Sequence, residues 1–248
     1  MKERLDKLLV SIGLASNRQQ ARGLILSGAV LVAGKKVSKA GAMVSPSAPI
    51  TLLKSALPYH GSRYVSRGGL KLEGALASFG IDPSGLIAVD VGASTGGFTD
   101  CLLQQGAIRV YAVDVGYGQL AWRLRQDPRV VVLERTHIRD LSPRQIPETA
   151  DLVTIDVSFI SLTHVLPKAM ELIAPGGRML ALVKPQFEVG RGGVGKGGIV
   201  RDPAKRQRAV EQIRNFAEGL GLRSEGVFES PVHGQDGNVE YFVLLKKL

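Results

Sequence analysis

The stretch Leu86-Ile-Ala-Val-Asp-Val-Gly-Ala-Ser-Thr-Gly-Gly-Phe-Thr-Asp100 joins an apolar run, a glycine-rich turn and the start of a helical pattern. A strand, a glycine turn and a helix in this order build the first cofactor crevice of a doubly wound α/β domain. A second apolar run, Arg109-Val-Tyr-Ala-Val-Asp114, ends on an acid about twenty residues after the turn, where a carboxylate accepts hydrogen bonds from ribose hydroxyls. These two runs predict a domain that binds an adenosine-bearing cofactor.

The spacing of the glycines bears on which cofactor this is. A dinucleotide fingerprint reads G-x-G-x-x-G and places a pyrophosphate on a helix N-terminus. Here Gly92 is followed by Gly96 and Gly97, and Asp90 precedes the turn. An acid at that position would repel a pyrophosphate and suit the cationic amino-acid end of S-adenosylmethionine. We therefore expect S-adenosylmethionine, with a nicotinamide-dependent oxidoreductase and a turn that binds nothing as the alternatives.

The length and composition exclude several classes of protein. A chain of 248 residues, 44% of them hydrophobic, can form one large or two unequal domains. Its one cysteine, Cys101, rules out a disulfide framework and is expected to be a buried helix residue. No signal-peptide pattern is present, and no apolar run reaches the roughly eighteen residues that a membrane span needs. We expect a cytoplasmic protein with no membrane partner.

The positive charge is concentrated at the start of the chain. Residues 1–63 hold ten Lys and Arg against two acids, a net charge of +8, whereas the remaining 22 Lys and Arg face 20 acids, a net charge of +2. A small basic module ahead of a nearly neutral one predicts a polyanion-binding arm. The alternative is a basic surface that only aids solubility.

The basic module shows a helical pattern followed by a strand pattern. Residues 4–13 predict a helix, and a second helix is expected to start at an N-cap, Ser16, and to end at Gly28. Residues 30–32 alternate as a strand, residues 33–35 predict a turn, and Val37 resumes the β pattern.

Three segments of this module resemble the S4-type RNA-binding domain: Arg4-Leu-Asp-Lys-Leu-Leu9, Ser16-Asn-Arg-Gln-Gln-Ala-Arg22 and Ile25-Leu-Ser-Gly-Ala-Val-Leu-Val-Ala-Gly-Lys35. The resemblance covers residues 1–60, with Ala33 in place of an Asn that is common before the turn glycine. It implies a small α+β domain whose helices and hairpin present a basic face to structured RNA. Arginine and lysine contacts to phosphates supply affinity on such a face without sequence readout. The face would comprise Arg4, Lys7, Arg18, Arg22, Lys35 and Lys36.

The remainder alternates strands and helices. Residues 46–58 are loop-rich with one short strand at 50–53, and residues 61–69 are expected to be a linker whose Arg63 and Arg67 also contact RNA. A domain from 70 to 248 is expected to open with a helix at Leu70. Further strands are predicted at 130–133, 151–156 and 178–184, helices at 162–174 and 203–220, and an antiparallel hairpin from 222–232 and 240–245.

A glycine-rich segment, residues 187–200, contains a partial phosphate-loop pattern. Gly197 stands where that loop needs a Ser or Thr for magnesium, and no helix pattern clearly starts there. We interpret the segment instead as a loop that covers the substrate.

Four ionisable residues come from separate segments: Lys71, Asp156, Lys184 and Glu240. Three of them lie at strand ends that should meet at one edge of the sheet. Together they resemble the Lys-Asp-Lys-Glu tetrad of FtsJ-like ribose 2′-O-methyltransferases. Five segments further resemble the TlyA (haemolysin A) family: Ser66-Arg-Gly-Gly-Leu-Lys-Leu72, Asp90-Val-Gly-Ala-Ser-Thr-Gly-Gly-Phe98, Asp156-Val-Ser-Phe-Ile-Ser161, Lys184-Pro-Gln-Phe-Glu188 and Gly198-Ile-Val-Arg-Asp-Pro203.

The resemblance implies a Rossmann-like class I methyltransferase domain with a mostly parallel seven-stranded sheet that ends in an antiparallel hairpin. It implies methylation of a cytidine 2′-hydroxyl in ribosomal RNA, with ribosomal subunits as the partner and no other protein partner. A ribose hydroxyl is a weak nucleophile and benefits from a base. We assign this role to Lys184, favoured in its neutral form by Lys71 and the cofactor's sulfonium. Asp156 would orient Lys184, and Glu240 would position Lys71 or the ribose.

The family pattern also implies cofactor contacts. Asp114 would bind the ribose, His137 and Ile138 would flank the adenine, and the methionine end would be held by Asp90, Gly92, Ser94, Gly96, Gly97, Phe98 and Thr99. The four histidines show no metal-ligand spacing, so we expect no metal site. Two further alternatives are a non-catalytic RNA-binding assembly factor and a membrane-active haemolysin.

Overall fold

The computed structural model describes residues 2–15, 18–26, 28–52, 63–142, 144–234 and 237–248. The chain forms two compact units, Met1–Gly61 and Ser62–Leu248. The predicted N-cap Ser16, the end of the predicted strand at Leu53 and the start of the predicted linker lie outside the described residues. In the ranges that are described, no helix combines the length and the apolar character that crossing a membrane requires.

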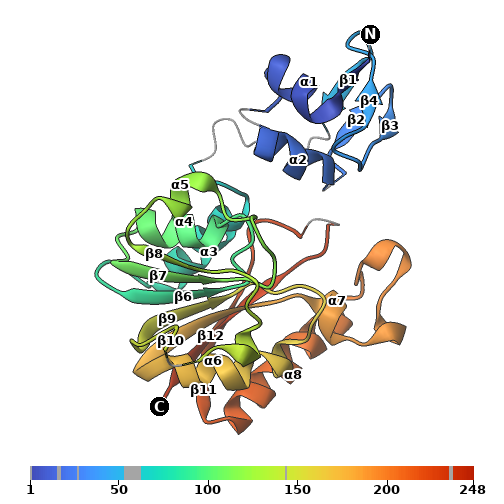
Figure 1. The fold of residues 1–248 in the computed structure, drawn as a ribbon. Helices are drawn as coiled ribbons and strands as arrows, with labels where there is room; N and C mark the ends of the chain where they lie inside the picture. Colours follow the sequence, from blue (N-terminus) through green and yellow to red (C-terminus); the bar gives the residue numbers. More distant parts are fainter. Residues whose placement is uncertain (1, 16–17, 27, 53–62, 143, 235–236) are drawn as a thin grey trace. The chain divides into compact units, whose positions relative to one another are not determined.

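The first unit packs two helices against short strands (Figure 1). The helices are α1 (Leu5–Ser11) and α2 (Arg18–Leu26). A three-stranded sheet has the order β3-β2-β5, with β2 (Val30–Val32), β3 (Lys35–Lys36) and β5 (Ile50–Leu52), and β1 (Glu3–Arg4) pairs with β4 (Met43–Val44). Its small core contains Leu5, Leu8, Leu9, Ala21, Ile25 and Val30.

Two expectations for this unit were wrong in detail. Arg4 does not start the first helix, because it pairs with Met43 in the β1–β4 ladder. Lys35 lies in a strand rather than in the turn, because Ala33 and Gly34 alone make the connection, with φ of 48° and 75°. A two-residue hairpin turn with positive φ at both positions suits Asn and Gly, so Ala33 occupies a strained position there.

The second unit is built on a seven-stranded sheet in the order β11-β12-β10-β9-β6-β7-β8. Only β12 runs antiparallel to its neighbours, so the sheet is mostly parallel as expected. The order turns back between β6 and β9, which is where open α/β sheets bind ligands. The strands are β6 (Ile87–Val91), β7 (Arg109–Val113), β8 (Val130–Leu133), β9 (Ala150–Ile155), β10 (Ile173–Val183), β11 (Leu222–Glu229) and β12 (Tyr241–Lys247).

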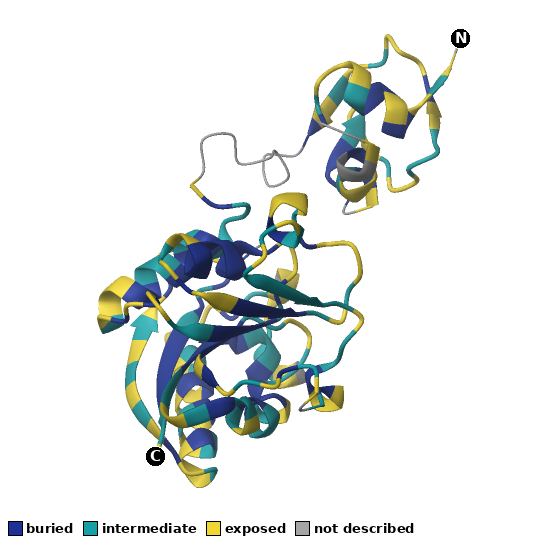
Figure 2. Cartoon of the chain, turned by 60° about the vertical axis from the view of Figure 1, so that its left-hand side comes forward, coloured by how far each residue is buried: buried dark blue, intermediate teal, exposed yellow. Residues whose placement is uncertain are grey.

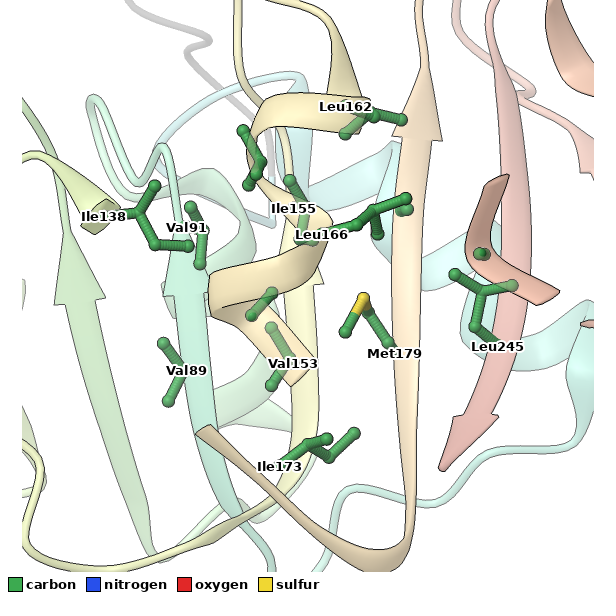
Figure 3. Close-up of a cluster of buried hydrophobic side chains, with 14 of the residues drawn as sticks. Val89, Val91, Ile138, Val153, Ile155, Leu162, Leu166, Ile173, Met179 and Leu245 are labelled. Atoms are coloured by element: carbon green, nitrogen blue, oxygen red, sulfur yellow. The ribbon is translucent and has the colours of Figure 1, made fainter. Parts of the chain in front are cut away.

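Helices bury both faces of this sheet (Figures 1 and 2). One face carries α3 (Gly68–Phe79), α4 (Gly97–Gln104) and α5 (Trp122–Arg125), and the other carries α6 (Leu166–Leu172) and α8 (Pro203–Gly219). Successive strand residues point to opposite faces. Ala88 therefore belongs to the first core, which lies under α3, α4 and α5, and Val89 belongs to the second core, which lies under α6 and α8. Figure 3 shows the second core, where Val89, Val153 and Met179 pack beneath Leu166.

The second unit departs from the predicted elements at several ends. The helix expected from Leu70 starts at Gly68. The helix expected at 162–174 is a 3₁₀ turn, η2 (Leu162–His164), followed by α6, after which Ile173 already belongs to β10. A short helix, α7 (Pro185–Glu188), was not expected between β10 and the glycine-rich segment, whose first two residues it includes. The remaining 3₁₀ turns are η1 (Ile138–Asp140), η3 (Arg191–Gly193) and η4 (Lys196–Gly198).

The end of the predicted linker packs as part of this second unit. Tyr64 is buried, and its hydroxyl donates to Glu73 on α3. The backbone N–H of Val65 donates to Asp100 on α4 at 2.7 Å. The described residues from Arg63 onward therefore belong to the fold rather than to a free connection, because a buried ring and a buried carboxylate hold them.

Candidate active site

The glycine turn after β6 needs unusual backbone angles. Gly92, Ser94 and Gly96 have φ of 85°, 48° and 95°. A Cβ atom on Gly92 would lie 2.4 Å from the carbonyl oxygen of Asp156, so a side chain there would collide with the neighbouring loop. A Cβ on Gly97 would lie 2.2 Å from the Ser66 hydroxyl. Glycines let the turn approach both neighbours closely.

Asp114 braces this turn from the end of β7. Its Oδ2 accepts the N–H of Ser94 at 2.7 Å and its Oδ1 accepts the N–H of Gly116 at 2.6 Å. The carboxylate is half-buried. Because a carboxylate offers about four acceptor positions, Asp114 keeps acceptor capacity for ribose hydroxyls while it holds the turn.

Asp90 and Thr99 lie beneath the turn and are fully buried. Oδ2 of Asp90 accepts the N–H of Thr99 at 2.9 Å and its hydroxyl at 2.7 Å, and Oδ1 accepts the Thr154 hydroxyl at 3.3 Å. Burial raises the pKa of Asp90 to about 7, a shift that these hydrogen bonds oppose and the charge of Asp156 adds to. Neither side chain has exposed surface in this structure, so both are placed to position the turn, and their expected direct contact with a cofactor stays a prediction.

Two further expected cofactor residues are core residues. The Phe98 ring is 3% exposed and packs 5.9 Å from the Phe242 ring. Ile138 is 5% exposed and faces Val91 in the second core (Figure 3). Both side chains are held by packing and keep little exposed surface, and their expected contacts with the cofactor stay a prediction. The half-buried His137 accepts the N–H of Arg139 through Nδ1 at 3.2 Å, which keeps its ring at the surface of the loop.

The structure joins the tetrad residues in two ion pairs. Lys71 Nζ lies 2.5 Å from Glu240 Oε2, and Lys184 Nζ lies 2.6 Å from Asp156 Oδ1. The side chains of Lys71 and Lys184 are 11% exposed. Glu240 is nearly enclosed, whereas the Asp156 side chain is 21% exposed.

The sheet register explains why these residues from distant segments meet. Val183 on β10 pairs with Tyr241 on the antiparallel strand β12. Lys184 directly follows Val183 and Glu240 directly precedes Tyr241, so both residues lie at the same end of the two strands. Asp156 follows β9, and its N–H donates to the carbonyl of Val91 at 2.9 Å, next to the glycine turn. Both ion pairs therefore lie at the carboxyl edge of the parallel strands, beside the turn.

Sequence reasoning missed two residues on the loop after Asp156. Ser158 accepts a hydrogen bond from Lys184 Nζ at 2.9 Å. Phe159 is 91% exposed, has φ of 65° and packs against Phe187 with ring centroids 5.2 Å apart. An exposed aromatic residue in a left-handed conformation is unusual, and it lies three residues from Asp156. Both residues belong to the segment Asp156–Ser161 quoted above. That segment could therefore have pointed to them, but the sequence analysis assigned no role to either residue.

A buried carboxylate ties this loop to the helix after Lys184. Glu188 accepts the Ser161 hydroxyl at 2.6 Å and the N–H of Leu162 at 3.0 Å. Burial raises the pKa of Glu188, and its hydrogen bonds to Ser161 and Leu162 oppose that shift. Lys184 is the N-cap residue of α7, and Glu188 is the last residue of the same helix. The hydrogen bonds of Glu188, called the Glu188 clamp below, therefore connect the loop that carries Ser158 and Phe159 to the helix that starts at Lys184.

The expected RNA-contacting residues of the first unit are all exposed: Arg4, Lys7, Arg18, Arg22, Lys35 and Lys36. In the second unit Arg63 is exposed and pairs with Glu73 at 2.5 Å, while Arg67 is half-buried beside the start of α3. The exposure of the cations in the first unit makes them accessible to phosphates, and the contacts of all eight residues with RNA stay a prediction. Over the described ranges, no group of three or more His, Cys, Asp and Glu side chains could hold a metal.

The comparison with protein families decides the assignment. Residues 64–247 match the FtsJ-like methyltransferase model, and residues 3–50 match the S4 domain model. The chain belongs to the FtsJ-like methyltransferase family. It is 49% identical over 243 residues to the 16S/23S rRNA (cytidine-2′-O)-methyltransferase TlyA of Mycobacterium tuberculosis, covering 98% of this chain and 89% of that relative.

Two further relatives share most of the chain. Hemolysin A of Brachyspira hyodysenteriae is 39% identical and is matched over 97% of its length by 96% of this chain. A solved Streptococcus thermophilus structure, provisionally described as a hemolysin, is 42% identical with a TM-score of 0.73, covering 99% of this chain and 88% of that one. The family assignment confirms an S-adenosylmethionine-dependent methyltransferase and sets aside the nicotinamide-dependent alternative.

The residues of the turn fit S-adenosylmethionine. Gly92 and Gly96 let the turn pack directly against Asp156 and Leu124, where a Cβ would collide, and the half-buried Asp114 retains acceptors for the ribose. Asp156 Oδ1 is a buried atom that makes the ion pair with Lys184 but has no hydrogen-bond partner. The carboxylate of Asp156 beside the glycine turn suits a ligand that carries a positive charge and a ribose.

Proposed function

We propose that the protein methylates the 2′-hydroxyl of a cytidine ribose in ribosomal RNA within ribosomal subunits, inside the cytoplasm. The main support for this proposal is that two ion pairs, Lys184–Asp156 and Lys71–Glu240, lie at the sheet edge beside the glycine turn. The relatives named as ribosomal RNA cytidine-2′-O-methyltransferases support the substrate, since one of them covers nearly the whole chain. The exposed cations of the S4-type unit support binding to structured RNA.

Lys184 would act as the general base of this reaction. A neutral Lys184 Nζ can accept the proton of the ribose hydroxyl, and the adjacent Asp156 then stabilises the ammonium group that forms. The Ser158 hydroxyl accepts from the same nitrogen and fixes where it points. Bound S-adenosylmethionine supplies an electrophilic methyl group on a sulfonium.

Lys71 would supply positive charge on the other side of the site. Glu240 holds its ammonium group at 2.5 Å, and both side chains are almost enclosed. A fixed cation beside the ribose would stabilise the negative charge that develops on the 2′-oxygen. Asp114 would hold the cofactor ribose, while Asp90 and Thr99 would position the glycine turn.

Phe159 would contact the substrate base. Its exposed ring lies on the loop between Asp156 and Ser161, supported from one side by Phe187. Unpaired bases in RNA commonly stack on aromatic side chains, and a base next to the reacting ribose lies within reach of a loop at the same sheet edge.

Methyl transfer from labelled S-adenosylmethionine to purified, unmethylated ribosomal subunits tests the proposal. Label should appear in RNA as an alkali-resistant 2′-O-methyl dinucleotide, and Lys184→Ala should lose it. Lys168→Ala is a matched control, because Lys168 also pairs with a carboxylate, Glu171 at 2.6 Å, but lies on α6 and belongs to neither catalytic ion pair.

The two subunits and free ribosomal RNA are assayed separately. Label on free RNA alone would contradict the subunit context. No label on any substrate, with cofactor still bound, would contradict the catalytic proposal and favour the RNA-binding assembly factor.

A further inference from the structure

The first unit contains a carboxylate that is completely buried yet faces two exposed cations. Asp6 has 0% of its surface exposed. Its Oδ1 accepts Arg4 Nε at 3.0 Å, and its Oδ2 accepts both Arg4 Nη2 at 2.9 Å and Arg18 Nη2 at 3.0 Å. The side chains of Arg4 and Arg18 remain 45% and 54% exposed. One buried acid therefore holds two guanidinium groups side by side at the surface.

The two arginines come from different elements. Arg4 lies in β1 beside Met43, and Arg18 starts α2. Asp6 is fixed between them in the first turn of α1, where its N–H donates to the carbonyl of Ala40 at 3.2 Å. The shared carboxylate thus links a strand and two helices at one point on the unit.

The chemistry of the cluster leaves donors for a ligand. A guanidinium group has five N–H donors, and Asp6 takes two from Arg4 and one from Arg18. The hydrogen bonds from Arg4 and Arg18 hold the pKa of Asp6 well below its usual range, so the acid stays ionised and the cluster keeps a net positive charge. The remaining donors belong to two side chains that are 45% and 54% exposed, so they are accessible to a ligand.

We propose that Arg4 and Arg18 form one preorganised phosphate clamp for the RNA backbone, with Asp6 as its positioning residue. The inference rests on RNA binding by this unit as proposed above and adds how the affinity arises. Arginine presents donors in a planar fork that matches phosphate geometry. Fixing two such forks in advance removes the side-chain entropy that each arginine would otherwise lose on binding.

The clamp makes a prediction opposite to that of simple electrostatics. Asp6→Asn removes a negative charge from a phosphate-binding surface, so charge alone predicts tighter RNA binding. The clamp predicts weaker binding, because an asparagine has a single acceptor oxygen and points N–H donors at the arginines. We expect about tenfold weaker binding to purified ribosomal RNA and a salt dependence reduced by about one phosphate contact.

Glu3→Gln in the full-length protein is the matched control. Glu3 is three residues from Asp6 and carries the same charge, but it does not take part in the cluster. It should leave RNA affinity unchanged or slightly raised. In methyl-transfer assays Asp6→Asn should raise the KM for RNA at unchanged kcat, a division that general loss of structure would not produce. Affinity of Asp6→Asn equal to or above that of Glu3→Gln would overturn the clamp.

A second set of variants applies if Asp6→Asn fails to fold, as judged by thermal unfolding. Arg4→Gln and Arg18→Gln are measured alone and together. A shared phosphate predicts that the double variant loses less affinity than the product of the two single losses. Two independent losses that multiply would overturn the proposal. Binding is measured without S-adenosylmethionine, so a failed clamp is distinguished from a failed methyltransferase assignment.

Discussion

The Arg4–Asp6–Arg18 cluster and the Lys184–Asp156 pair both join a carboxylate to cations, yet they suit different work. In the first, a fully buried acid holds two half-exposed arginines. In the second, a lysine that is 11% exposed meets an acid that is 21% exposed. An arginine keeps its charge at any working pH, whereas an enclosed lysine can exchange a proton. The difference separates a surface that binds anions from a site that moves a proton.

The strongest test of this difference replaces the lysine of the second pair with arginine and one arginine of the first cluster with lysine. Lys184→Arg keeps the positive charge but removes a group that can act as a base, so we expect kcat to fall by roughly 10² to 10⁴-fold. Arg18→Lys keeps the charge that a phosphate needs, so RNA affinity should change by less than about tenfold. Single-turnover methyl transfer and RNA-binding titrations measure the two effects. Comparable losses of kcat in both variants would remove the distinction.

The acid of the catalytic pair should matter less than its base. Asp156→Asn removes the charge that stabilises protonated Lys184 across an ion pair of 2.6 Å. We therefore expect kcat to fall by roughly 10- to 100-fold. Rates are measured against pH at saturating RNA, beside Asp151→Asn, an exposed acid at the start of β9. A wild-type rate in Asp156→Asn would show that the pair is only structural.

The Glu188 clamp should have a smaller effect, since it acts through the loop that carries Ser158. Glu188→Ala leaves the Ser161 hydroxyl and the Leu162 N–H without their acceptor, and we expect a loss of about tenfold in kcat. Glu188→Gln can still accept from Leu162 and contact Ser161, so it should recover most of the rate. Cofactor affinity, measured by calorimetry, should be unchanged in both. Equal losses in the two variants would argue against positioning by hydrogen bonds.

The smallest expected effect contrasts two buried acids, Asp6 and Asp90. Burial raises the pKa of Asp90 to about 7, above its ordinary value of 3.8. Between roughly pH 4 and 7 the folded state holds a proton that the unfolded state has lost, so this group makes the free energy of unfolding fall as pH rises through that window. The pKa of Asp6 is lowered instead, so its contribution stays constant there and is lost only in acid.

Thermal unfolding of the wild type and Asp90→Asn from pH 4.5 to 8 measures this contrast. The stability of the variant should fall less than that of the wild type as pH rises, because asparagine can keep the bonds to Thr99 and Thr154 without titrating. Parallel curves for the two proteins would contradict a titrating Asp90.

Local pattern was enough to identify most elements of the chain. The apolar run ending at Val91 followed by Gly92 predicted the strand and turn, and the resemblance to a family tetrad implied that Lys184 and Asp156 work together. Such features are readable because periodicity and turn chemistry depend on near neighbours in sequence. Ends were misjudged where pairing with a distant strand overrode the helical pattern, as at Arg4 and Ile173.

The sequence by itself determined the fold class and the type of cofactor turn, because each is carried by contiguous motifs. The resemblance of four separate positions to a family tetrad indicated the chemistry of the site. The tertiary structure alone decided which side chains reach the surface. Asp90, Phe98 and Ile138 stand in cofactor motifs but are buried, since both faces of the sheet are covered. It also decided that Lys71 meets Glu240, 169 positions away, and that Arg4 and Arg18 share Asp6. Strand order and helix packing set those contacts, and neither is a local property of the chain.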